Sequence, residues 1–183
     1  MLIVLCGKTA SGKTLVRNML KNEGYSPIVT YTTRPPRTGE IDGKSYHFIS
    51  DEDFERGISE GKFAEYKSYD VYNGDTWYYG CSKESLTKDD NSVIILTPQG
   101  YRDIVDNLPD HVCIYLYANR STITKRLKLR GDPADEIQRR IKTDEDDFLN
   151  FQYQPNIKIV YNNTGTKIED VVKKIIGLVV RHG

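Results

Sequence analysis

Short apolar runs along the chain alternate with stretches in which apolar residues recur at helical spacing. The first run, 2–6, has no polar interruption, which is the pattern of a strand buried on both faces of a parallel sheet. A helical pattern over 14–22 follows and stops before Gly24. Further strand patterns lie at 93–97, 112–117 and 158–162, and further helical patterns at 100–107 and 168–179. Strands that alternate with helices predict an α/β fold with a parallel sheet.

The first of two segments that break this alternation is 30–81, which is rich in Tyr, Thr, Gly and Arg. It contains a helical pattern over 51–60, with Ser50 as the N-cap residue. The dipeptide Asn73-Gly74 favours a tight hairpin turn between two strands. The segment therefore indicates an inserted, largely antiparallel subdomain.

The second break, 130–147, begins where Gly131, Asp132 and Pro133 interrupt a helical pattern. The helix predicted after the break is very polar, and polar helices that bury little surface are candidates for mobile covers. We therefore expect one domain over 1–183, with a core over 1–29, 82–129 and 148–183, the inserted subdomain over 30–81 and a lid over 130–147.

The composition of the chain narrows the binding partners and the cellular compartment that we expect for such a domain. Lys plus Arg and Asp plus Glu are equal at 26 each, so no overall field favours a nucleic acid polymer or an anionic membrane. The first apolar run is shorter than a signal-peptide core, and no run is long enough to span a bilayer. The cysteines are odd in number and far apart, which is typical of reduced thiols: Cys6, Cys81 and Cys113. We expect a cytoplasmic protein, and the sequence indicates nothing of its oligomeric state.

A phosphate-binding motif lies between the first strand and the first helix. The pattern G-x-x-x-x-G-K-[ST] is matched without deviation by Gly7, Lys8, Thr9, Ala10, Ser11, Gly12, Lys13 and Thr14. The glycines let backbone N–H groups turn toward phosphate oxygens, and the helix that follows adds the positive end of its dipole. In such a loop Lys13 reaches the β- and γ-phosphates, and the Thr14 hydroxyl binds Mg²⁺.

This motif indicates a nucleoside triphosphate site but not the reaction. A glycine-rich turn that binds nothing is the plainer alternative, and it is disfavoured by the strand before the motif and the helix after it. GTPases, helicases and kinases share the loop, although helicases and motors are usually longer than 183 residues. The rest of the chain must distinguish between these classes.

A second candidate anion site lies in the string TYTTRPPRTGE, which begins at Thr30. Arg34 and Arg37 stand on a segment stiffened by two prolines, so both guanidinium groups can face one small anion with little loss of chain entropy. Hydroxyl groups of Tyr46 and Tyr79 can complete such a site. Taken alone, however, the string is more typical of a solvated turn with surface arginines.

The same string closely resembles the guanylate kinase pattern T-T-R-x-P-R-x-G-E, followed by a Tyr and a Phe, which binds the acceptor monophosphate. Later segments agree with this family: FAEY at 63–66, YYG at 78–80, TKRL leading to RG at 124–131, IQRRI at 137–141 and IVYN at 159–162. The resemblance covers nearly the whole chain. It implies a P-loop three-layer α/β fold with a parallel sheet core, a mixed α/β monophosphate-binding subdomain over 30–81 and a helical lid over 130–147.

The resemblance also implies an ATP-dependent nucleoside monophosphate kinase that uses Mg²⁺ and converts GMP or dGMP to the diphosphate. Its acceptor site would comprise Thr30, Arg34, Arg37, Tyr46, Glu65, Tyr79, Cys81 and Thr97. Glu65 corresponds to the residue that reads guanine in the family, and Asn162 to the one that lies near adenine.

The resemblance places the charge-neutralising groups of the reaction in the phosphate loop and the lid. Phosphoryl transfer between two nucleotides needs the developing charge neutralised and water excluded, and it needs no covalent nucleophile from the protein. Lys13, Arg130 and Arg140 would be the catalytic cations, with Arg126 and Arg139 as competitors for the lid pair. Arg126 would also contribute to ATP binding.

Three departures from the family pattern leave the acceptor open. Cys81 stands where the family usually has a serine, and a thiol is a much weaker donor. Ile95 and Thr97 stand where it usually has two aspartates, and the stretch 67–77 is longer than usual. A GMP/dGMP kinase is the favoured interpretation. The alternatives are a kinase of another deoxynucleotide or modified base, a kinase of a sugar phosphate, or a protein-binding module without catalysis.

Overall fold

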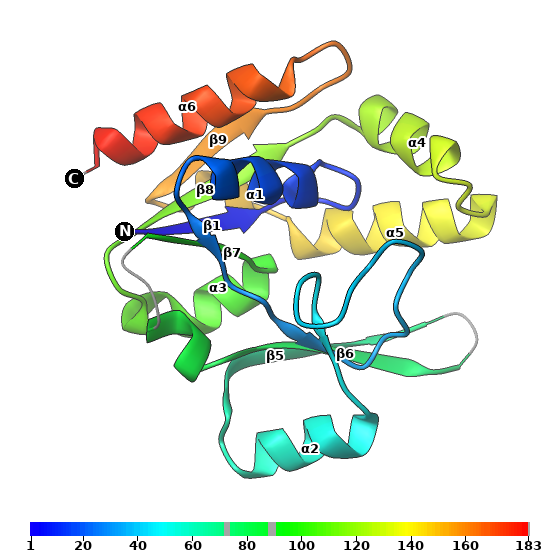
Figure 1. The fold of residues 1–183 in the computed structure, drawn as a ribbon. Coiled ribbons are helices and arrows are strands. Elements are labelled where there is room, and N and C mark those ends of the chain that lie inside the picture. The colour runs from blue at the N-terminus through cyan, green and yellow to red at the C-terminus, as the bar shows by residue number, and fades with distance from the viewer. Residues whose placement is uncertain (72–73, 88–90, 183) are drawn as a thin grey trace. The chain divides into compact units, whose positions relative to one another are not determined.

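The computed structural model describes residues 1–71, 74–87 and 91–182, and the chain forms two compact units (Figure 1). The first unit comprises Met1–Pro27, Asp90–Tyr101 and Pro109–Gly183, and the second comprises Ile28–Asp89 and Arg102–Leu108. The chain thus leaves the first unit after residue 27, builds most of the second unit, and enters it once more at 102–108 before it ends in the first.

A five-stranded parallel sheet forms the centre of the first unit. Its strands, in spatial order, are β2 (Ser26–Pro27), β7 (Ser92–Ile95), β1 (Leu2–Cys6), β8 (His111–Tyr117) and β9 (Ile157–Tyr161). The helices are α1 (Lys13–Asn22), α3 (Pro98–Ile104), α4 (Arg120–Leu129), α5 (Ala134–Asp147) and α6 (Ile168–Val180). The predicted parallel α/β core is confirmed, with boundaries shifted by one or two residues at several ends.

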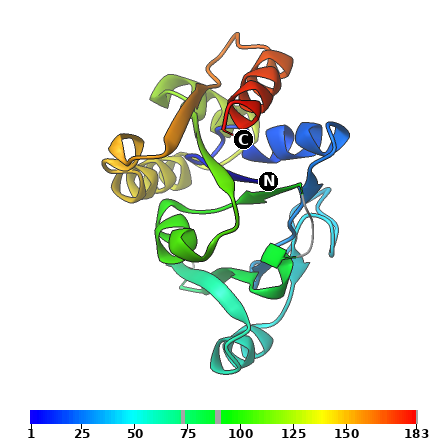
Figure 2. The ribbon, with the colours of Figure 1, turned by 90° about the vertical axis from the view of Figure 1, so that its left-hand side faces the viewer.

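Both faces of this sheet are covered, as the uninterrupted apolar run of β1 predicts. Ile3 and Leu5 pack with Val16 and Leu20 of α1 and with Ile175 of α6 on one face. Figures 1 and 2 show α1 and α6 side by side on that face, where they are in contact. Aromatic rings cluster at the other face: Tyr115 stacks on Phe148 at 5.1 Å and contacts Phe151, which contacts Tyr101.

The helices α4 and α5 are separated by the predicted Gly-Asp-Pro break at 131–133. Asn119 caps α4 by accepting a hydrogen bond from the Thr122 N–H at 2.9 Å. Of the 14 residues of α5, two are buried, so this helix buries little surface, as its polarity predicts. Ile137 and Ile141 lie four residues apart, so they form one stripe on α5, and they are buried in a cluster that also contains Ala118, Ile123 and Leu127.

The second unit contains a four-stranded sheet with the order β4 (His47–Phe48), β3 (Tyr31–Thr32), β6 (Thr76–Ser82) and β5 (Phe63–Asp70). In this sheet β3 and β4 pair in parallel, β3 and β6 pair antiparallel, and β5 and β6 form the predicted hairpin. Gly74 has the left-handed conformation that such a turn requires, whereas Asn73 lies outside the described residues. Short 3₁₀ turns lie at Glu84–Thr87, Val105–Asn107 and Phe151–Tyr153.

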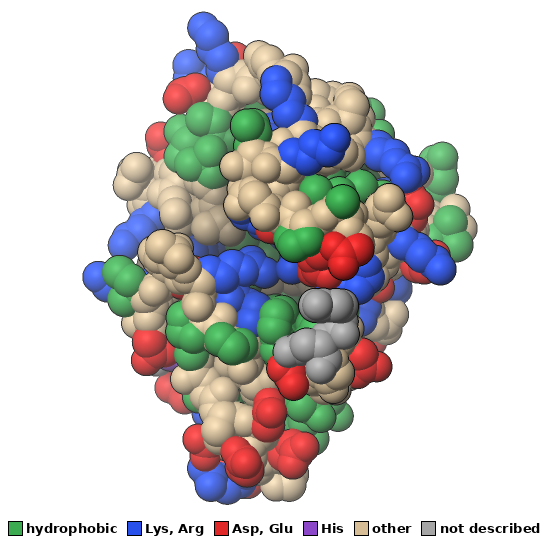
Figure 3. All heavy atoms as spheres, turned by 90° about the vertical axis from the view of Figure 1, so that its right-hand side faces the viewer, with side chains coloured by type: hydrophobic (Ala, Val, Ile, Leu, Met, Phe, Trp, Pro, Cys, Tyr) green, Lys and Arg blue, Asp and Glu red, His purple; other side chains and the backbone are tan. Residues whose placement is uncertain are grey.

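The helix of the second unit, α2 (Asp51–Ser59), begins as predicted after Ser50, whose side chain accepts from the Asp53 N–H at 3.1 Å. Phe54 fixes α2 to the sheet because its ring stacks on Phe63 at 4.3 Å and on Tyr78 at 5.2 Å. Acidic residues fill the first turn, where the helix dipole favours them. Figure 3 shows acidic side chains gathered at the foot of the view. Among the described residues, no helix is both long and apolar enough to cross a bilayer.

Candidate functional site

The phosphate loop joins β1 to α1 at the carboxyl end of the parallel sheet, where open α/β sheets bind ligands. Gly12 is at φ 101°, and Ala10 is also at positive φ, 53°. A Cβ atom on Gly12 would lie 2.5 Å from Nδ2 of the buried Asn162. The loop therefore requires glycine at this position both for its backbone conformation and for its close approach to Asn162.

We predict that Gly12→Ala lowers the free energy of unfolding by about 2 kcal/mol more than Gly24→Ala does. Both glycines have positive φ, but nothing lies within 4 Å of a Cβ atom added to Gly24. Comparing the two variants therefore distinguishes the cost of backbone strain, which both share, from the cost of the steric conflict with Asn162. Urea unfolding of both variants measures the difference, and equal losses would show that Asn162 moves aside without penalty.

Two predicted donor-site residues hold the loop from the sides. The Arg126 guanidinium donates to the Ala10 carbonyl at 3.0 Å and to Oδ1 of Asn162 at 3.4 Å. The Asn162 amide donates to the Ser11 carbonyl at 2.8 Å. These contacts place Arg126 and Asn162 beside the loop, and they fix the loop's curvature from α4 and from the end of β9.

The Lys13 ammonium group folds back over the loop and donates to the carbonyls of Gly7 at 2.5 Å and Lys8 at 2.9 Å. Burial lowers the pKa of Lys13, and the charge of Asp144 opposes that effect. Asp144 also accepts a hydrogen bond from the Thr9 N–H at 2.7 Å. A carboxylate from α5 is thus in the charge environment of the loop, which the sequence pattern alone did not suggest.

The residues around the loop also fit the expected magnesium ion. Thr14 lies in the first turn of α1 and is exposed, so its hydroxyl is open to a ligand. Mg²⁺ in triphosphate sites keeps several waters and takes one or two protein oxygens together with phosphate oxygens. The described residues contain no group of three or more His, Cys, Asp or Glu arranged to hold a metal by themselves, so Thr14 is the candidate ligand on the chain.

The lid arginines are paired with acids close by in sequence. Arg130 forms a two-bond ion pair with Asp132, with one bond from Nε to Oδ1 at 3.0 Å. Arg139 and Arg140 both bind Glu136, at 2.7 Å and 2.6 Å. Hydrogen bonds from Arg139 and the charges of both arginines lower the pKa of Glu136. Arg126, one of the competitors for the lid pair, contacts the phosphate loop through the Ala10 carbonyl.

Arg34 is the buried centre of the candidate anion site in the second unit, exposed by only 3%. Its guanidinium donates to Pro35 O at 2.6 Å and to Glu40 at 2.9 Å, and it lies 5.5 Å from the centre of the Tyr46 ring. Its Nε atom is buried and has no hydrogen-bond partner in the described part of the chain. A buried guanidinium with an unsatisfied N–H is suited to an anionic ligand, so the interpretation as a solvated turn is wrong for Arg34.

Glu40 organises this loop, a role that the sequence patterns did not indicate. Its second carboxylate oxygen accepts from the Arg37 N–H at 2.7 Å while the first binds Arg34. Burial raises the pKa of Glu40, but the hydrogen bonds from Arg37 and Arg34 and their charges outweigh it, so the pKa is lowered overall. The Arg37 side chain is exposed. The rings of Tyr46 and Tyr79 lie edge to face, with their centres 6.1 Å apart.

Glu65 and Cys81 are paired across β5 and β6 and are both buried. Burial raises the pKa of Glu65 to about 7, although the Cys81 N–H donates to its carboxylate. Burial likewise raises the pKa of Cys81 to about 12, and its thiol donates to the Ser82 carbonyl at 3.5 Å. A carboxyl group and a neutral thiol therefore lie next to each other in the second unit.

The remaining predicted acceptor residues lie at strand and helix ends. The Thr30 carbonyl accepts from the His47 N–H at 2.8 Å, which links the segment before β3 to β4. Thr97 belongs to the first unit, whereas the other seven belong to the second. It follows β7, and its hydroxyl accepts from the Gly100 N–H at 2.9 Å, so it caps α3.

Comparisons with known proteins agree with this geometry. The guanylate kinase family model matches residues 1–178. A guanylate kinase from Clostridium tetani is 32% identical over 186 residues, covering 98% of this chain and 85% of that protein, and one from Caldanaerobacter subterraneus is 31% identical, covering 96% and 86%. The crystal structure of guanylate kinase from Anaplasma phagocytophilum superimposes with a TM-score of 0.69 at 21% identity, covering 99% of this chain and 85% of that one, a likeness in fold.

Proposed function

Since the chain belongs to the guanylate kinase family, we propose that it transfers the terminal phosphoryl group of ATP to a nucleoside monophosphate, namely GMP or dGMP. The observation that carries this proposal is the intact phosphate loop, held between Arg126 and Asn162, in a chain that matches the family over almost its full length. The products are ADP and GDP or dGDP.

The donor nucleotide binds along the phosphate loop. The N–H groups of the loop and the positive end of α1 bind the phosphate oxygens, while Arg126 and Asn162 border the nucleoside side. Lys13 leaves the carbonyls of Gly7 and Lys8 to neutralise charge on the β- and γ-phosphates. The Thr14 hydroxyl would hold Mg²⁺, and the ion would supply positive charge that neutralises part of the charge of the phosphates.

The acceptor monophosphate binds in the second unit. Arg34 and Arg37 bind its phosphate, with hydroxyl groups of Tyr46, Tyr79 and Thr30 around it, and the Arg34 Nε supplies a donor that is already desolvated. Within this unit the base is recognised by Glu65 and Cys81. An ionised carboxylate at Glu65 accepts from N1–H and N2–H of guanine, a pair of donors that adenine lacks.

The lid completes the charge requirement. Arg130 and Arg140 exchange their ion pairs with Asp132 and Glu136 for contacts with the transferred phosphoryl group. Arg126 and Arg139 are the competing residues for this role. The acceptor phosphate attacks directly, so the protein supplies position, charge and exclusion of water rather than a covalent intermediate. We assign the core to 1–29, 82–129 and 148–183, the monophosphate-binding subdomain to 30–81 and the lid to 130–147.

The protein-binding alternative requires a chain that has lost phosphate-loop chemistry. Here Lys13, Thr14 and the conformation of Gly12 are all in place. We also propose a cytoplasmic location, because Cys6, Cys81 and Cys113 are free and buried, which suits a reducing compartment.

A panel of acceptors tests the choice of substrate. With ATP and Mg²⁺, we expect kcat/KM for GMP and dGMP to exceed the values for AMP, dTMP, dCMP and a hexose phosphate by at least about 100-fold, since a site built around a buried hydrogen-bonding group rejects analogues that lack its partner. If another acceptor gives a higher kcat/KM than GMP, that acceptor is the substrate, and the proposed donor site is unaffected by the result.

Replacing the thiol that lies beside Glu65 tests base recognition. Cys81→Ser restores a strong hydroxyl donor next to Glu65, so the ratio of kcat/KM for GMP to that for AMP should rise about tenfold. The matched control is Cys113→Ser, a buried thiol in β8, which should leave the ratio unchanged. If the two variants give the same ratio as the unmodified protein, Cys81 does not contact the base.

A further inference from the structure

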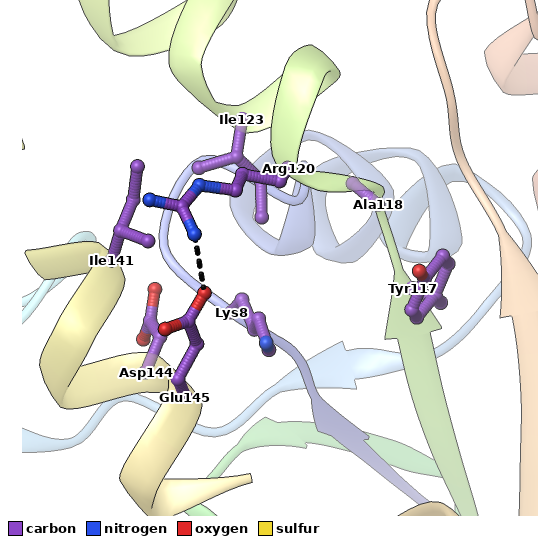
Figure 4. Close-up of a pocket in the computed structure, with 8 residues that line it drawn as sticks. All are labelled: Lys8, Tyr117, Ala118, Arg120, Ile123, Ile141, Asp144 and Glu145. Atoms are coloured by element: carbon purple, nitrogen blue, oxygen red, sulfur yellow. Dashed lines mark hydrogen bonds and ion pairs between the residues drawn. The ribbon is translucent and has the colours of Figure 1, made fainter.

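The carboxyl-terminal part of α5 reaches the phosphate loop through Asp144. Its Oδ2 atom accepts a hydrogen bond from the Thr9 N–H at 2.7 Å, across 135 positions of sequence. Thr9 is the third residue of the loop motif, and loop N–H groups are the donors that phosphate oxygens require. Figure 4 shows the Asp144 side chain projecting from α5 toward the loop that carries Lys8. Both partners belong to the first unit.

The charges around Asp144 are those that a phosphate oxygen would meet. Burial raises the pKa of Asp144, and the charge of Asp147 adds to this effect; the Thr9 N–H and the charges of Lys13 and Lys8 oppose it without outweighing it, so the pKa is raised overall. The interaction is mutual, because the Asp144 charge also opposes the lowering of the Lys13 pKa by burial. A carboxylate of α5 is therefore held by one loop amide and two lysine charges.

A neighbouring ion pair fastens the same end of α5. Glu145 binds Arg120 of α4 at 3.2 Å, as the dashed line in Figure 4 shows. Both side chains are largely exposed, so this pair by itself adds little stability. Together with Lys8, Asp144 and Tyr117, the pair lines a hollow of about 110 Å³ beside the loop. The end of α5 is thus tied to the loop at Asp144 and to α4 at Glu145.

We propose that Asp144 is an internal competitor of the donor triphosphate: its carboxylate occupies the loop amide and the lysine charge that the terminal phosphates of ATP take over. This inference rests on the proposed donor site and adds a regulation of it. A carboxylate and a γ-phosphate cannot share one amide and one ammonium group without strong repulsion, so ATP must displace Asp144.

Displacement has two consequences. ATP binds to molecules in which Asp144 has left the loop, so the apparent affinity for ATP is the intrinsic affinity multiplied by the fraction of such molecules. The release of Asp144 also removes one of the two contacts that hold the carboxyl-terminal end of α5, so that donor binding and movement of the lid are linked. Asp144 is then a positioning residue that makes the lid respond to a triphosphate.

The test is equilibrium binding of ATP, without GMP, to the full chain and to Asp144→Asn, which keeps an acceptor for Thr9 but removes the charge. We expect the Kd for ATP to fall about tenfold in Asp144→Asn. The Kd for adenosine, which has no phosphate, should be unchanged. The matched control is Asp146→Asn, an exposed acid two residues further along α5, which should leave both constants unchanged.

The KM values for ATP and GMP are a second measurement, and a purely structural role of Asp144 would not change one of them without the other. In Asp144→Asn the KM for ATP should fall while the KM for GMP stays constant, and Asp144→Ala should behave in the same way if the asparagine variant does not fold. Equal or weaker ATP binding by both variants overturns the competitor role and leaves the proposed function standing. No ATP binding by any of the proteins, including the unmodified chain, overturns the donor site and the competitor together.

Discussion

Replacing Lys13 by alanine should lower the rate of phosphoryl transfer from ATP to GMP by about 1,000-fold, which is the scale of removing one well-placed charge from a transition state. Lys13 is the cation of the phosphate loop, and its ammonium group already lies within 3 Å of two loop carbonyls, so a small movement brings it to the β- and γ-phosphates. Single-turnover kinetics at saturating ATP measures the chemical step directly.

Binding of GMP should be nearly unaffected in Lys13→Ala, because the acceptor contacts are assigned to Arg34 and Arg37 in the second unit. Isothermal titration with GMP tests this. Lys21→Ala removes an exposed lysine from the last turn of α1 and serves as the control, with an unchanged transfer rate expected. Full turnover by Lys13→Ala would remove Lys13 from the mechanism.

Glu65→Gln should raise the KM for GMP by about 100-fold, because an amide in place of the carboxylate can accept only one of the two guanine N–H groups and sets a donor against the other. The same change should stabilise the fold at alkaline pH. Burial raises the pKa of Glu65 from its ordinary value to about 7, so ionisation of this side chain opposes folding.

The direction of the pH effect follows from that raised pKa. Below about pH 4.5 Glu65 is protonated in both the folded and the unfolded chain, so it imposes no penalty; the penalty grows as the pH rises toward 7 and is complete above it. At pH 8, Glu65→Gln should therefore unfold with a free energy up to about 3 kcal/mol higher than the unmodified protein, and the gain should shrink toward pH 4.5.

The control for this prediction is Glu60→Gln, which changes an exposed carboxylate at the end of α2 and should alter neither the KM for GMP nor the pH dependence. Urea unfolding at several pH values and initial rates with GMP are the two measurements. A gain in stability without a change in KM would show a buried carboxyl group that does not read the base.

The parts of the fold with strong local signals were predictable from the sequence. An apolar run such as β1 is typical of a strand buried on both faces of a parallel sheet, and the loop motif identifies its own position between that strand and α1. Local polar signals were also sufficient for the helix start at Ser50 and the break at Gly131.

The parts that were missed depend on contacts between distant segments. The polarity of α5 concealed the stripe of Ile137 and Ile141, because two apolar residues among many charges look solvated until α4 is packed against them. Asp144 lies in an acidic run that favours solvent, and only the packing of α5 brings it to Thr9. The role of Glu40 was also missed, although its contacts are local: it follows Arg34 and Arg37 within six residues, and its proximity to them in the sequence could have indicated it.

The most direct test of the central claim is the product balance of one reaction. The protein is incubated with ATP, Mg²⁺ and GMP, the nucleotides are separated by ion-exchange chromatography, and Lys13→Ala prepared in the same way measures contaminating kinases. We predict that ADP and GDP appear in equal amounts, and that no ADP forms when GMP is omitted. Absence of GDP above the Lys13→Ala background, whether or not ATP is consumed, would contradict a phosphoryl transfer from ATP to GMP.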